Sequence, residues 1–556
     1  MDLDEDFDEQ EEEEGGGGGG EDMTVSEIDE FSNPSMDSDS QVRVKHQNKE
    51  VHDAQPNQFN LKTQRTEDGV DFISKLPDEL LHEILSYASL RDVVRTSILS
   101  SRWRYISAYK PFLRFSWNEM FTNWNLNAKG KPCMVFEKKI RRAVNDYIRF
   151  YRGDKIHSFK FCFCSNKSIC FRDLGYDGFD GAADVDGWIK FALNKCVESL
   201  TLFADCPFDC CKNHCFLPRN FVFEYIFRIE LFDGMTISLK HLKLKCCELG
   251  PNFTNQFSSL ETLSLDNVNC LARNLESMLP FLGNLKTLEI SNSILPKKLS
   301  LVSLPLLRKF LAYRTKSLEE IELSSPYLVE LKCLDGRGNP EDLAYYIKWP
   351  VKCNFSGAPK LTSLSYMVPI AEMDVMFTDI SRQNPELRNL TVVILNDWFK
   401  WTPTRNVWTL SQVTHLNLRV FKSSYFSFAR AMAILKAFPN LRVFRLIMHC
   451  KEDLKEETEE EHDLSYVPEY LEDFSFSYFH CSKLQMQFAE YLLKYASALE
   501  KMSILIDPKG SQYPFYKGRY RGMTYWSVAN TLREFDKRNI LDVQTSEEII
   551  FGSISR

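Results

Sequence analysis

Apolar residues follow two different patterns along this chain, and each pattern predicts a different structure. Near the N-terminus five of them fall at positions i, i+1, i+4, i+5 and i+8: Leu80, Leu81, Ile84, Leu85 and Ala88. This spacing is typical of the apolar face of one helix. Pro77 suits the first position of that helix, and Ser89 and Ser100 suit the starts of two more. We therefore predict three short helices within residues 70–112.

Farther along the chain the pattern becomes that of short, repeated strands. The leucine-rich unit L-x-x-L-x-L-x-x-N/C-x-L buries its leucines in a strand and turns at the Asn or Cys. One segment matches all five positions, with Leu239, Leu242, Leu244, Cys247 and Leu249. Shorter matches begin at Val197, Leu260, Leu285, Leu307, Leu328, Leu361, Leu387, Val413, Leu441, Leu471 and Leu499. Their nearly regular spacing predicts an α/β solenoid, a curved array of leucine-rich repeats over residues 155–515.

The segments around the repeats carry other signals. Ten of the first fourteen residues are acidic, and six glycines follow at 15–20. Such a composition cannot bury enough apolar surface to offset the entropy lost on ordering. We predict a disordered acidic tail over 1–68, with a specific acidic docking arm as the alternative. Residues 113–154 are predicted to be a helical linker, and residues 516–556 a C-terminal extension.

Composition and charge narrow the class of protein. The chain has 556 residues, 44% of them hydrophobic, and a net charge of −9. The first 70 residues hold 21 acidic and 5 basic side chains, a net of −16, so the rest carries −9 + 16 = +7. The chain has neither an apolar run of membrane-spanning length nor a basic-then-apolar N-terminus. We expect a protein of the cytoplasm or nucleus that has no membrane partner. Nucleic-acid binding has little support from this charge distribution. The 16 cysteines are expected to be unpaired thiols.

The predicted helical segment resembles an F-box of the plant type. The resemblance rests on the leading Leu76-Pro77, the middle Val93-Val94-Arg95-Thr96 and the closing Arg102-Trp103-Arg104 at fixed spacing. Residues of about 470–507 resemble the FBD domain, which closes many plant F-box proteins with leucine-rich repeats. From the residues alone, this segment is one more repeat, with a helix and the strand Met502-x-Ile504-x-Ile506. We predict that it caps the exposed end of the array, as atypical terminal repeats do.

The F-box resemblance implies a function. It implies docking on a Skp-type adaptor and, through this adaptor, association with the cullin and RING subunits of a ubiquitin ligase. The implied adaptor-binding residues are Leu76, Pro77, Leu80, Ile84, Leu85, Val94 and Trp103. The chain would then be a non-catalytic subunit that recognises the substrate of an SCF-type (Skp–cullin–F-box) ligase. A leucine-rich-repeat scaffold that works independently of a ligase is the alternative.

The repeats indicate where a target protein would bind. Residues between the buried leucines of each strand face the concave surface of a leucine-rich solenoid. The candidate target-binding residues are His241, Lys243, Lys245, Asp266, His415, Asn417, Arg419 and Arg445. Several of them are basic, which favours an acidic or phosphorylated target of unknown identity.

Two segments raise the question of a metal site. Cys206, Cys210, Cys211, His214 and Cys215 offer zinc ligands, but they lack the paired C-x-x-C spacing of structural zinc sites. We predict a cysteine-rich loop, with zinc binding and redox sensing as alternatives. The Asp- and Gly-rich stretch 173–186 lacks the order of calcium-binding loops and is predicted to be a surface loop. The sequence contains none of the phosphate-binding, zinc-protease or nucleophile-elbow motifs, so we predict no catalytic residue, metal or cofactor.

Overall fold

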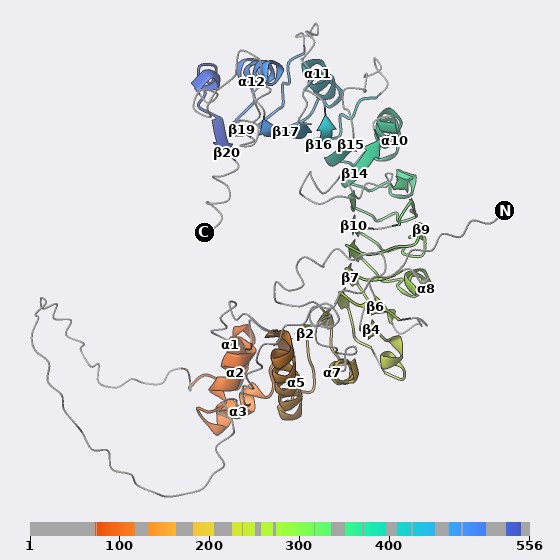
Figure 1. The fold of residues 1–556 in the computed structure, drawn as a ribbon, viewed down its shortest axis with the longest axis vertical. Coiled ribbons are helices and arrows are strands. Elements are labelled where there is room, and N and C mark those ends of the chain that lie inside the picture. Colours follow the sequence, from red (N-terminus) through yellow and green to blue (C-terminus); the bar gives the residue numbers. More distant parts are fainter. Residues whose placement is uncertain are drawn as a thin grey trace, which may run out of the picture. The chain divides into compact units, whose positions relative to one another are not determined.

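The structure is a computed structural model. It describes residues 73, 75–116, 120, 132–162, 182–204, 225–235, 237–250, 257–270, 274–315, 317–334, 351–369, 372–395, 408–423, 426–450, 466–479, 482–506 and 530–545. The chain divides into two compact units, Met1–Val70 and Asp71–Arg556, and all described residues belong to the second (Figure 1). The predicted acidic tail and the segment Cys206–Cys215 lie outside the described residues.

Three short helices form first: α1 (Asp78–Tyr87), α2 (Leu90–Thr96) and α3 (Ser101–Ser107). Ser89 and Ser100 cap α2 and α3. The backbone N–H of Asp92 donates to Ser89 Oγ, and that of Trp103 donates to Ser100 Oγ, each at 3.2 Å. Such caps satisfy N–H groups that lack partners in the first turn of a helix. The predicted three-helix segment is confirmed, with Pro77 one position before α1.

A single parallel sheet of 15 strands dominates the described chain, and each strand pairs with the strands before and after it in the repeats. In order along the sheet the strands are β1 (Phe112–Phe115), β2 (Ser158–Cys162), β3 (Ser199–Phe203), β5 (His241–Lys245), β7 (Thr262–Asp266), β8 (Thr287–Ser291), β10 (Lys309–Tyr313), β12 (Glu330–Leu334), β14 (Ser363–Pro369), β15 (Asn389–Leu395), β16 (His415–Ser423), β17 (Val443–Cys450), β18 (Asp473–Phe479), β19 (Lys501–Ile506) and β20 (Leu541–Thr545).

The register of the sheet stacks the leucines of successive repeats. Leu242 of β5 lies beside Leu200 and Leu263, and all three are fully or almost fully buried. Every one of the predicted copies contains a strand that starts two residues after its first apolar residue. The curved leucine-rich solenoid is therefore confirmed. Stacking buries a continuous core that no single repeat could form alone.

The sheet also extends past both predicted ends of the array, which corrects two boundaries. Strand β1 and helix α5 (Pro132–Phe150) fall in the predicted helical linker, yet β1 pairs with β2 and α5 buries Val144 in the main core. Strand β20 falls in the predicted C-terminal extension and pairs with β19. Phenylalanines take the leucine positions in β1 and β2, at Phe115, Phe159 and Phe161. The leucine pattern therefore missed these strands.

Helices, 3-10 turns and minor strands connect successive strands of the main sheet. The helices are α7 (Ala182–Asn194), α8 (Asn274–Met278), α10 (Met373–Gln383), α11 (Phe428–Ala437) and α12 (Lys483–Tyr495), with 3-10 turns η3 (Ile229–Phe232), η5 (Leu279–Phe281) and η6 (Phe355–Gly357). The minor strands are β4 (Ile226–Phe227), β6 (Glu248–Leu249), β9 (Lys298–Ser300), β11 (Glu320–Glu322) and β13 (Lys352–Cys353). Figure 1 shows α10, α11 and α12 on the convex side of the curved sheet. Among the described helices, none combines the length and apolar character needed to cross a bilayer.

The FBD-like segment continues this pattern. Helix α12 begins with a capping box between Ser482 and Gln485, and it buries Met486, Ala489 and Leu493 on one face. Strands β18 and β19 on either side of it pair with each other in the main sheet. The predicted helix and strand are confirmed. The described segment is thus built as a repeat of the solenoid.

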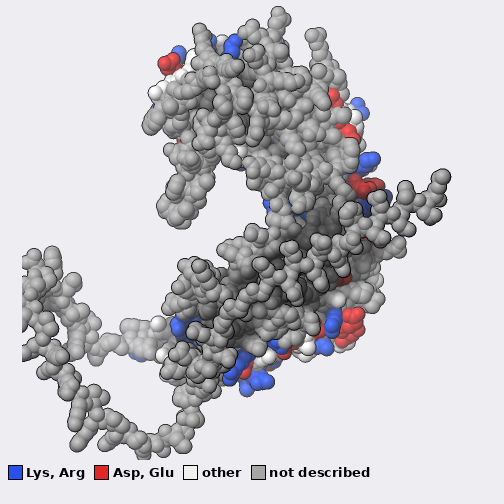
Figure 2. All heavy atoms as spheres, viewed as in Figure 1, with Lys and Arg blue, Asp and Glu red and all other residues white. Residues whose placement is uncertain are grey.

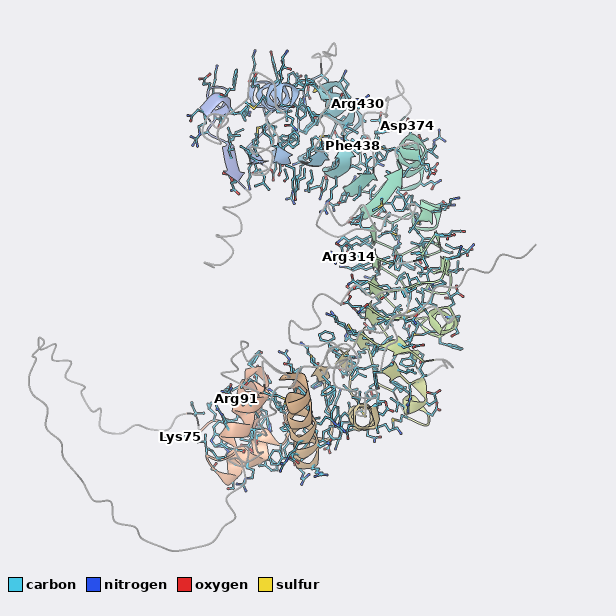
Figure 3. All side chains as sticks on the ribbon, viewed as in Figure 1. Lys75, Arg91, Arg314, Asp374, Arg430 and Phe438 are labelled. Carbon is cyan, nitrogen blue, oxygen red and sulfur yellow. The ribbon has the colours of Figure 1, made fainter. Side chains whose placement is uncertain are left out.

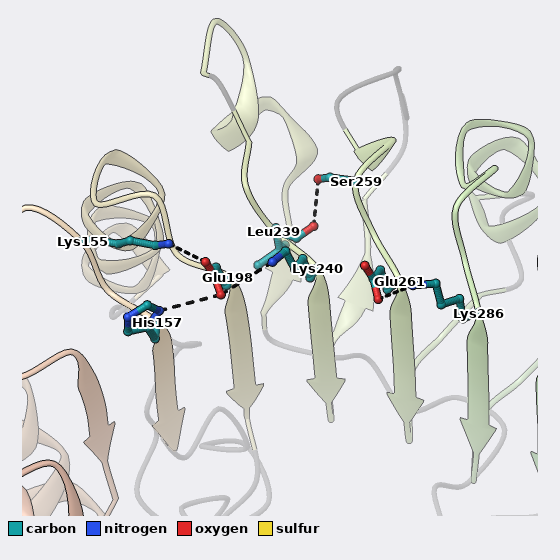
Figure 4. Close-up of polar contacts among 8 residues, drawn as sticks. All are labelled: Lys155, His157, Glu198, Leu239, Lys240, Ser259, Glu261 and Lys286. Carbon is teal, nitrogen blue, oxygen red and sulfur yellow. Dashed lines mark hydrogen bonds and ion pairs between the residues drawn. The ribbon is translucent and has the colours of Figure 1, made fainter. Parts of the chain in front are cut away.

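Charged residues at the starts of neighbouring strands link the repeats (Figure 4). Lys155 Nζ lies 2.5 Å from Glu198 Oε1, and Lys240 Nζ lies 3.9 Å from Glu198 Oε2. The hydrogen bond from Lys155, with the positive charges around it, holds the pKa of the Glu198 carboxyl below its ordinary value. Two repeats on, Lys286 pairs with Glu261 at 2.8 Å. These ion pairs link several of the first repeats to their neighbours at the starts of the strands.

Candidate functional site

The three-helix segment has a small core of its own and an apolar outer surface. Its buried core consists of Leu81, Leu85, Val93, Trp103 and Ile106. Its exposed apolar residues include Leu80, Ile84, Tyr87, Val94, Ile98, Leu99 and Tyr105. Because exposed apolar side chains gathered on one small unit are typical of a binding surface, this segment is a candidate docking site.

The structure divides the predicted adaptor-binding residues into two groups. Leu80, Ile84 and Val94 are 46%, 48% and 44% exposed, and Pro77 is exposed beside them. Leu76 is half-buried. By contrast, Leu85 and Trp103 lie inside the core of the three helices, so they would support a docking surface from within. The sequence analysis missed Tyr87, Ile98 and Leu99, although all three lie in the apolar stretches that predicted the helices.

Buried polar contacts hold the three helices to the first strand of the sheet. Lys110 is 5% exposed, and its ammonium donates to the carbonyl oxygens of Leu85, Ser86 and Ala88 at 2.6, 3.0 and 2.9 Å. A cation is favourable here, because the carbonyl end of a helix carries partial negative charge. Tyr147 of α5 donates to the carbonyl oxygen of Ser107 at 3.0 Å, and burial raises the pKa of the Tyr147 hydroxyl.

The predicted target-binding residues lie at the alternate, outward-facing positions of their strands. On β5, His241 and Lys243 are exposed while Leu242 and Leu244 between them are buried. The same alternation holds on β16 and β17 for His415, Asn417, Arg419 and Arg445. Figure 3 shows the side chains on the concave side of the sheet, including Arg314 directly after β10. The structure thus places all of the predicted residues on one face, but distributes them over two separate groups of strands.

The first group lies on β2, β3, β5 and β7. Lys160 Nζ and Lys243 Nζ lie 5.3 and 5.8 Å from the centre of the Phe203 ring, so two lysine cations contact the same aromatic ring. Lys245 pairs with Asp266 of the next strand at 3.7 Å. Cation–aromatic contacts of this kind offset part of the charge. The sequence analysis missed Lys160, because β2 was not predicted. It also missed Phe203, although the predicted copy at Val197 contains its strand, β3.

Ion pairs join neighbouring strands in the middle of the concave face. Glu330 of β12 lies 3.2 Å from Lys309 and 2.5 Å from Lys332. The hydrogen bond from Lys332, followed by the one from Lys309, holds the pKa of the Glu330 carboxyl below its ordinary value. On the face of the molecule seen in Figure 2, which shows mainly the outer side of the repeats, basic and acidic residues are also interspersed. Glu330 thus offsets part of the positive charge of the two lysines beside it.

The second group lies on β16 and β17. In the register of the sheet Asn417 lies beside Arg445, and Arg419 lies beside Ile447. The buried Nε of Arg419 and the buried Oδ1 of Asn417 have no hydrogen-bond partner in the structure. The Nε–H of Arg419 therefore lacks an acceptor in the structure, whereas Arg445 on the neighbouring strand is exposed.

The described residues carry little that resembles catalytic chemistry. Among them, no group of three or more His, Cys, Asp or Glu side chains is arranged to hold a metal ion. The thiols of Cys247 and Cys270 are buried, and neither forms a disulfide. Burial raises the pKa of the Cys270 thiol to about 12, so this thiol stays protonated. The predicted surface loop over 173–186 is described only from residue 182, where α7 begins.

Two family models match this chain. Residues 73–115 match the F-box domain, and residues 175–517 match the family described as At1g61320/AtMIF1, LRR domain. The second match runs through the FBD-like segment, whose resemblance to the FBD domain stays a prediction. A solved structure, the APL1 leucine-rich repeat domain, is 12% identical and covers 71% of this chain and 90% of its own, with a TM-score of 0.26.

The names of two relatives from Arabidopsis thaliana include both the F-box and the leucine-rich repeat. F-box/LRR-repeat protein At3g03360 is 29% identical over 241 residues, which are 40% of this chain and 41% of the relative. F-box/LRR-repeat protein 25 is 30% identical over 237 residues, which are 40% of this chain and 73% of the relative. The chain thus spans less than half of the first relative's length. The matched LRR-domain model covers more than half of this chain, so the protein belongs to the F-box family with leucine-rich repeats of the At1g61320/AtMIF1 type.

Proposed function

We propose that this protein is the substrate-recognition subunit of an SCF-type ubiquitin ligase, which docks on a Skp-type adaptor through the F-box and holds a target on the repeats. The F-box and the repeats support an adaptor-type role in general. The observation that carries the finer proposal is the exposed apolar surface of α1 and α2, separate from the buried core of the same helices. That surface needs a partner to cover it.

The chain itself would perform no bond chemistry. Its contribution would be to raise the effective concentration of target lysines near the ubiquitin-loaded enzyme. Rigid attachment matters for this role, and the contacts of Lys110 and Tyr147 supply it by holding the F-box to the start of the solenoid. The cullin and RING subunits would associate through the adaptor. We expect the complex in the cytoplasm or nucleus.

Neighbouring residues of α1 provide a matched test. Leu80 and Ile84 are about half exposed, whereas Leu81 and Leu85 next to them are buried. The double variant Leu80→Ala/Ile84→Ala should keep the melting temperature and lose adaptor binding by about 30-fold or more, because apolar anchors of an interface cost roughly 2 kcal/mol or more each when truncated. Leu81→Ala/Leu85→Ala should instead lower the stability of the F-box. Binding is measured by titrating the full chain with purified Skp-type adaptor.

The outcome separates the two candidate functions. Wild-type adaptor affinity in the folded Leu80→Ala/Ile84→Ala variant would contradict docking through this surface. Absence of any adaptor binding by the folded wild-type chain would favour the ligase-independent scaffold.

A further inference from the structure

We propose that three stacked turns in the middle of the solenoid form a docking surface for an acidic segment of a partner protein that carries apolar side chains. The turns span residues 304–307, 325–328 and 358–361, and they lead into β10, β12 and β14. We call this surface the turn patch. The inference goes beyond the proposed function, because it concerns neither the F-box nor the concave face and applies to a ligase subunit and a scaffold alike.

The same local chemistry fixes each of the three turns. In every turn the backbone N–H of the fourth residue donates to the carbonyl oxygen of the first, at 3.0 to 3.2 Å. The second residue is always proline, whose restricted φ favours a turn. The third residue is Leu306, Tyr327 or Lys360, and all three are exposed. Because the turns are stiff, a partner loses little affinity to the ordering of their backbone.

Contacts between the turns place their third residues in one row. Ser325 Oγ of the second turn donates to the carbonyl oxygen of Leu304 in the first, at 3.4 Å. The Lys360 ammonium of the third turn lies 4.9 Å from the centre of the Tyr327 ring in the second. Leu306 has the equivalent position in the first turn. With neighbouring strands about 4.8 Å apart, these side chains follow one another along the edge of the sheet.

The turn patch exposes apolar side chains. Leu306 and Tyr327 are 40% and 48% exposed, and Val302 and Val329 lie within two residues of these turns at 47% and 39%. An earlier repeat has the polar Asn284 at this position, and its amide donates to a carbonyl oxygen of the preceding repeat at 2.7 Å. The turn patch has leucine and tyrosine there instead. Exposed apolar side chains gathered in this way are typical of a binding surface.

Two cations border these apolar residues. Arg308 directly follows the first turn and Lys360 belongs to the third, and both are exposed. The backbone N–H of Val329 donates to the carbonyl oxygen of Arg308 at 2.8 Å, so one cation lies next to the apolar group. Among the residues that the structure describes, no carboxylate pairs with Arg308 or Lys360, whereas Lys309 pairs with Glu330 at 3.2 Å. The positive charge therefore favours a partner of negative charge.

The small number of cations favours a protein segment over a membrane. Each Lys or Arg near an anionic membrane contributes about 1 kcal/mol, and membrane recognition uses clusters of about 4–8. Arg308 and Lys360 with apolar side chains between them instead match a short segment in which acidic and apolar residues alternate. Its apolar side chains would pack on Leu306 and Tyr327. Its carboxylates would lie near the two cations, and nothing in this recognition requires a phosphate.

Peptide binding to the full chain tests the turn patch. The probes are three fluorescent nonapeptide libraries. In the acidic–apolar library, Asp or Glu alternates with Leu, Phe or Tyr. In the acidic–serine library serine replaces the apolar residues, and in the basic–apolar library lysine replaces the acidic ones. Binding is followed by fluorescence anisotropy. The acidic–apolar library should bind at least about tenfold more tightly than either of the others, because apolar anchors and charge both contribute.

Two double variants separate these contributions. Leu306→Ser/Tyr327→Ser should lower the affinity for the acidic–apolar library at least about tenfold, because it removes the apolar anchors. Arg308→Glu/Lys360→Glu should lower it to a similar extent and should raise the affinity for the basic–apolar library, because it reverses the charge. The second variant changes only exposed charged side chains, so it tests the site even if the first does not fold.

Tyr470→Ser serves as the matched control. Tyr470 is a tyrosine of 51% exposure that directly precedes Leu471, as Tyr327 precedes Leu328, but Glu469 stands beside it in place of a cation. This variant should leave peptide binding unchanged, and thermal unfolding should show which variants are folded. Equal binding of the acidic–serine library would overturn the proposal. So would wild-type affinity in either folded double variant, or an equal loss in Tyr470→Ser.

Other occupants and the proposed function are tested separately. Cosedimentation with phosphatidylserine vesicles that is lost in Arg308→Glu/Lys360→Glu would assign the surface to a membrane and overturn the proposal. A dimer of the full chain that Leu306→Ser/Tyr327→Ser dissociates would assign it to a second copy, with the same consequence. Adaptor titration reports on the F-box, so failure there leaves the turn patch unaffected. Intact adaptor binding without preference for the acidic–apolar library would overturn this inference alone.

Discussion

Lys110 and Leu85 form a buried hydrogen bond of 2.6 Å between the lysine ammonium and the carbonyl oxygen near the end of α1. The same ammonium also bonds the carbonyls of Ser86 and Ala88, so one side chain closes the C-terminus of the helix. Lys110 is separated from strand β1 by a single residue. The F-box and the first strand of the solenoid are thus joined by a short connection, which the buried Lys110 ammonium anchors to α1.

Replacing this lysine should destabilise the junction. Lys110→Met keeps the aliphatic chain but leaves three carbonyl oxygens without the ammonium, and an unsatisfied buried acceptor costs about 1–3 kcal/mol. We expect a loss of stability in this range, measured by urea unfolding of the full chain. Lys352→Met, at an exposed lysine of β13, should change stability by less than about 0.5 kcal/mol. An equal effect of the two substitutions would show that the buried ammonium contributes nothing.

A glycine in η6 marks a close approach of two backbone segments. A Cβ at Gly357 would lie 2.1 Å from the carbonyl oxygen of Leu323, whereas a Cβ at Gly283 would meet nothing within 4 Å. Gly357→Ala should therefore cost about 1–3 kcal/mol through overpacking. Gly283→Ala should be neutral or stabilising by up to about 1 kcal/mol, because alanine restricts the unfolded chain. Thermal unfolding of both variants measures the difference, and a stable Gly357→Ala protein would contradict the close approach.

The ion pairs of Glu198 give the stability of the first repeats a predictable pH dependence. The pKa of Glu198 is lower in the folded chain than its ordinary value of 4.5, so the unfolded state binds more protons between the two values. The stabilisation is fully present above pH 4.5 and is lost as the pH falls through the folded pKa. Wild type should exceed Glu198→Gln in stability at pH 7, and the gap should close below pH 4.5.

Glu319→Gln serves as a control, because it removes an ion pair that is exposed at the surface. Glu319 pairs with Lys297 at 3.0 Å, with both side chains more than half exposed. Glu319→Gln should change stability less at pH 7, since exposed pairs contribute little. A gap between wild type and Glu198→Gln that stays constant from pH 7 to pH 3.5 would argue against the ion pairs as its cause.

The solenoid should depend on its C-terminal strands. Truncation after Tyr470 removes β18, β19 and β20 and uncovers the packed residues Phe444, Leu446 and Met448 of β17. We expect aggregation or poor expression, because neighbour contacts alone cover the end of such a stack. Truncation after Ile506 removes only β20 among the described strands and should stay soluble with a lower melting temperature. Size-exclusion chromatography compares the two, and a soluble, cooperatively unfolding chain ending at Tyr470 would show that the later strands are dispensable.

Much of the solenoid could be predicted because regularly spaced leucines mark each repeat. Leu239, Leu242 and Leu244 align with their counterparts in later copies, and the alignment also gives the register of the strands. The leucine pattern did not predict strands β1 and β20, and the reason is physical. A buried position requires bulk and apolarity rather than leucine, so Phe115 and Val543 fill it equally well.

The candidate sites were predictable only in part. Leu80 and Leu81 are both leucines on one helix, and the sequence alone does not tell which of them faces the core and which faces solvent. Arg419 and Lys245 likewise both face the concave side. Only the positions of neighbouring side chains show that Lys245 has an acidic partner, while the Nε of Arg419 has none.

The local nature of the F-box core has a consequence during synthesis. Its buried cluster lies entirely within residues 76–106, so its contacts are complete once that part of the chain is made. Another 556 − 106 = 450 residues follow, which takes roughly 20–90 s at about 5–20 residues per second. We expect the docking segment to fold on the ribosome while the repeats are still emerging one after another. Under the proposed function, a nascent chain would then be able to meet an adaptor before the repeats that we propose to bind the target exist.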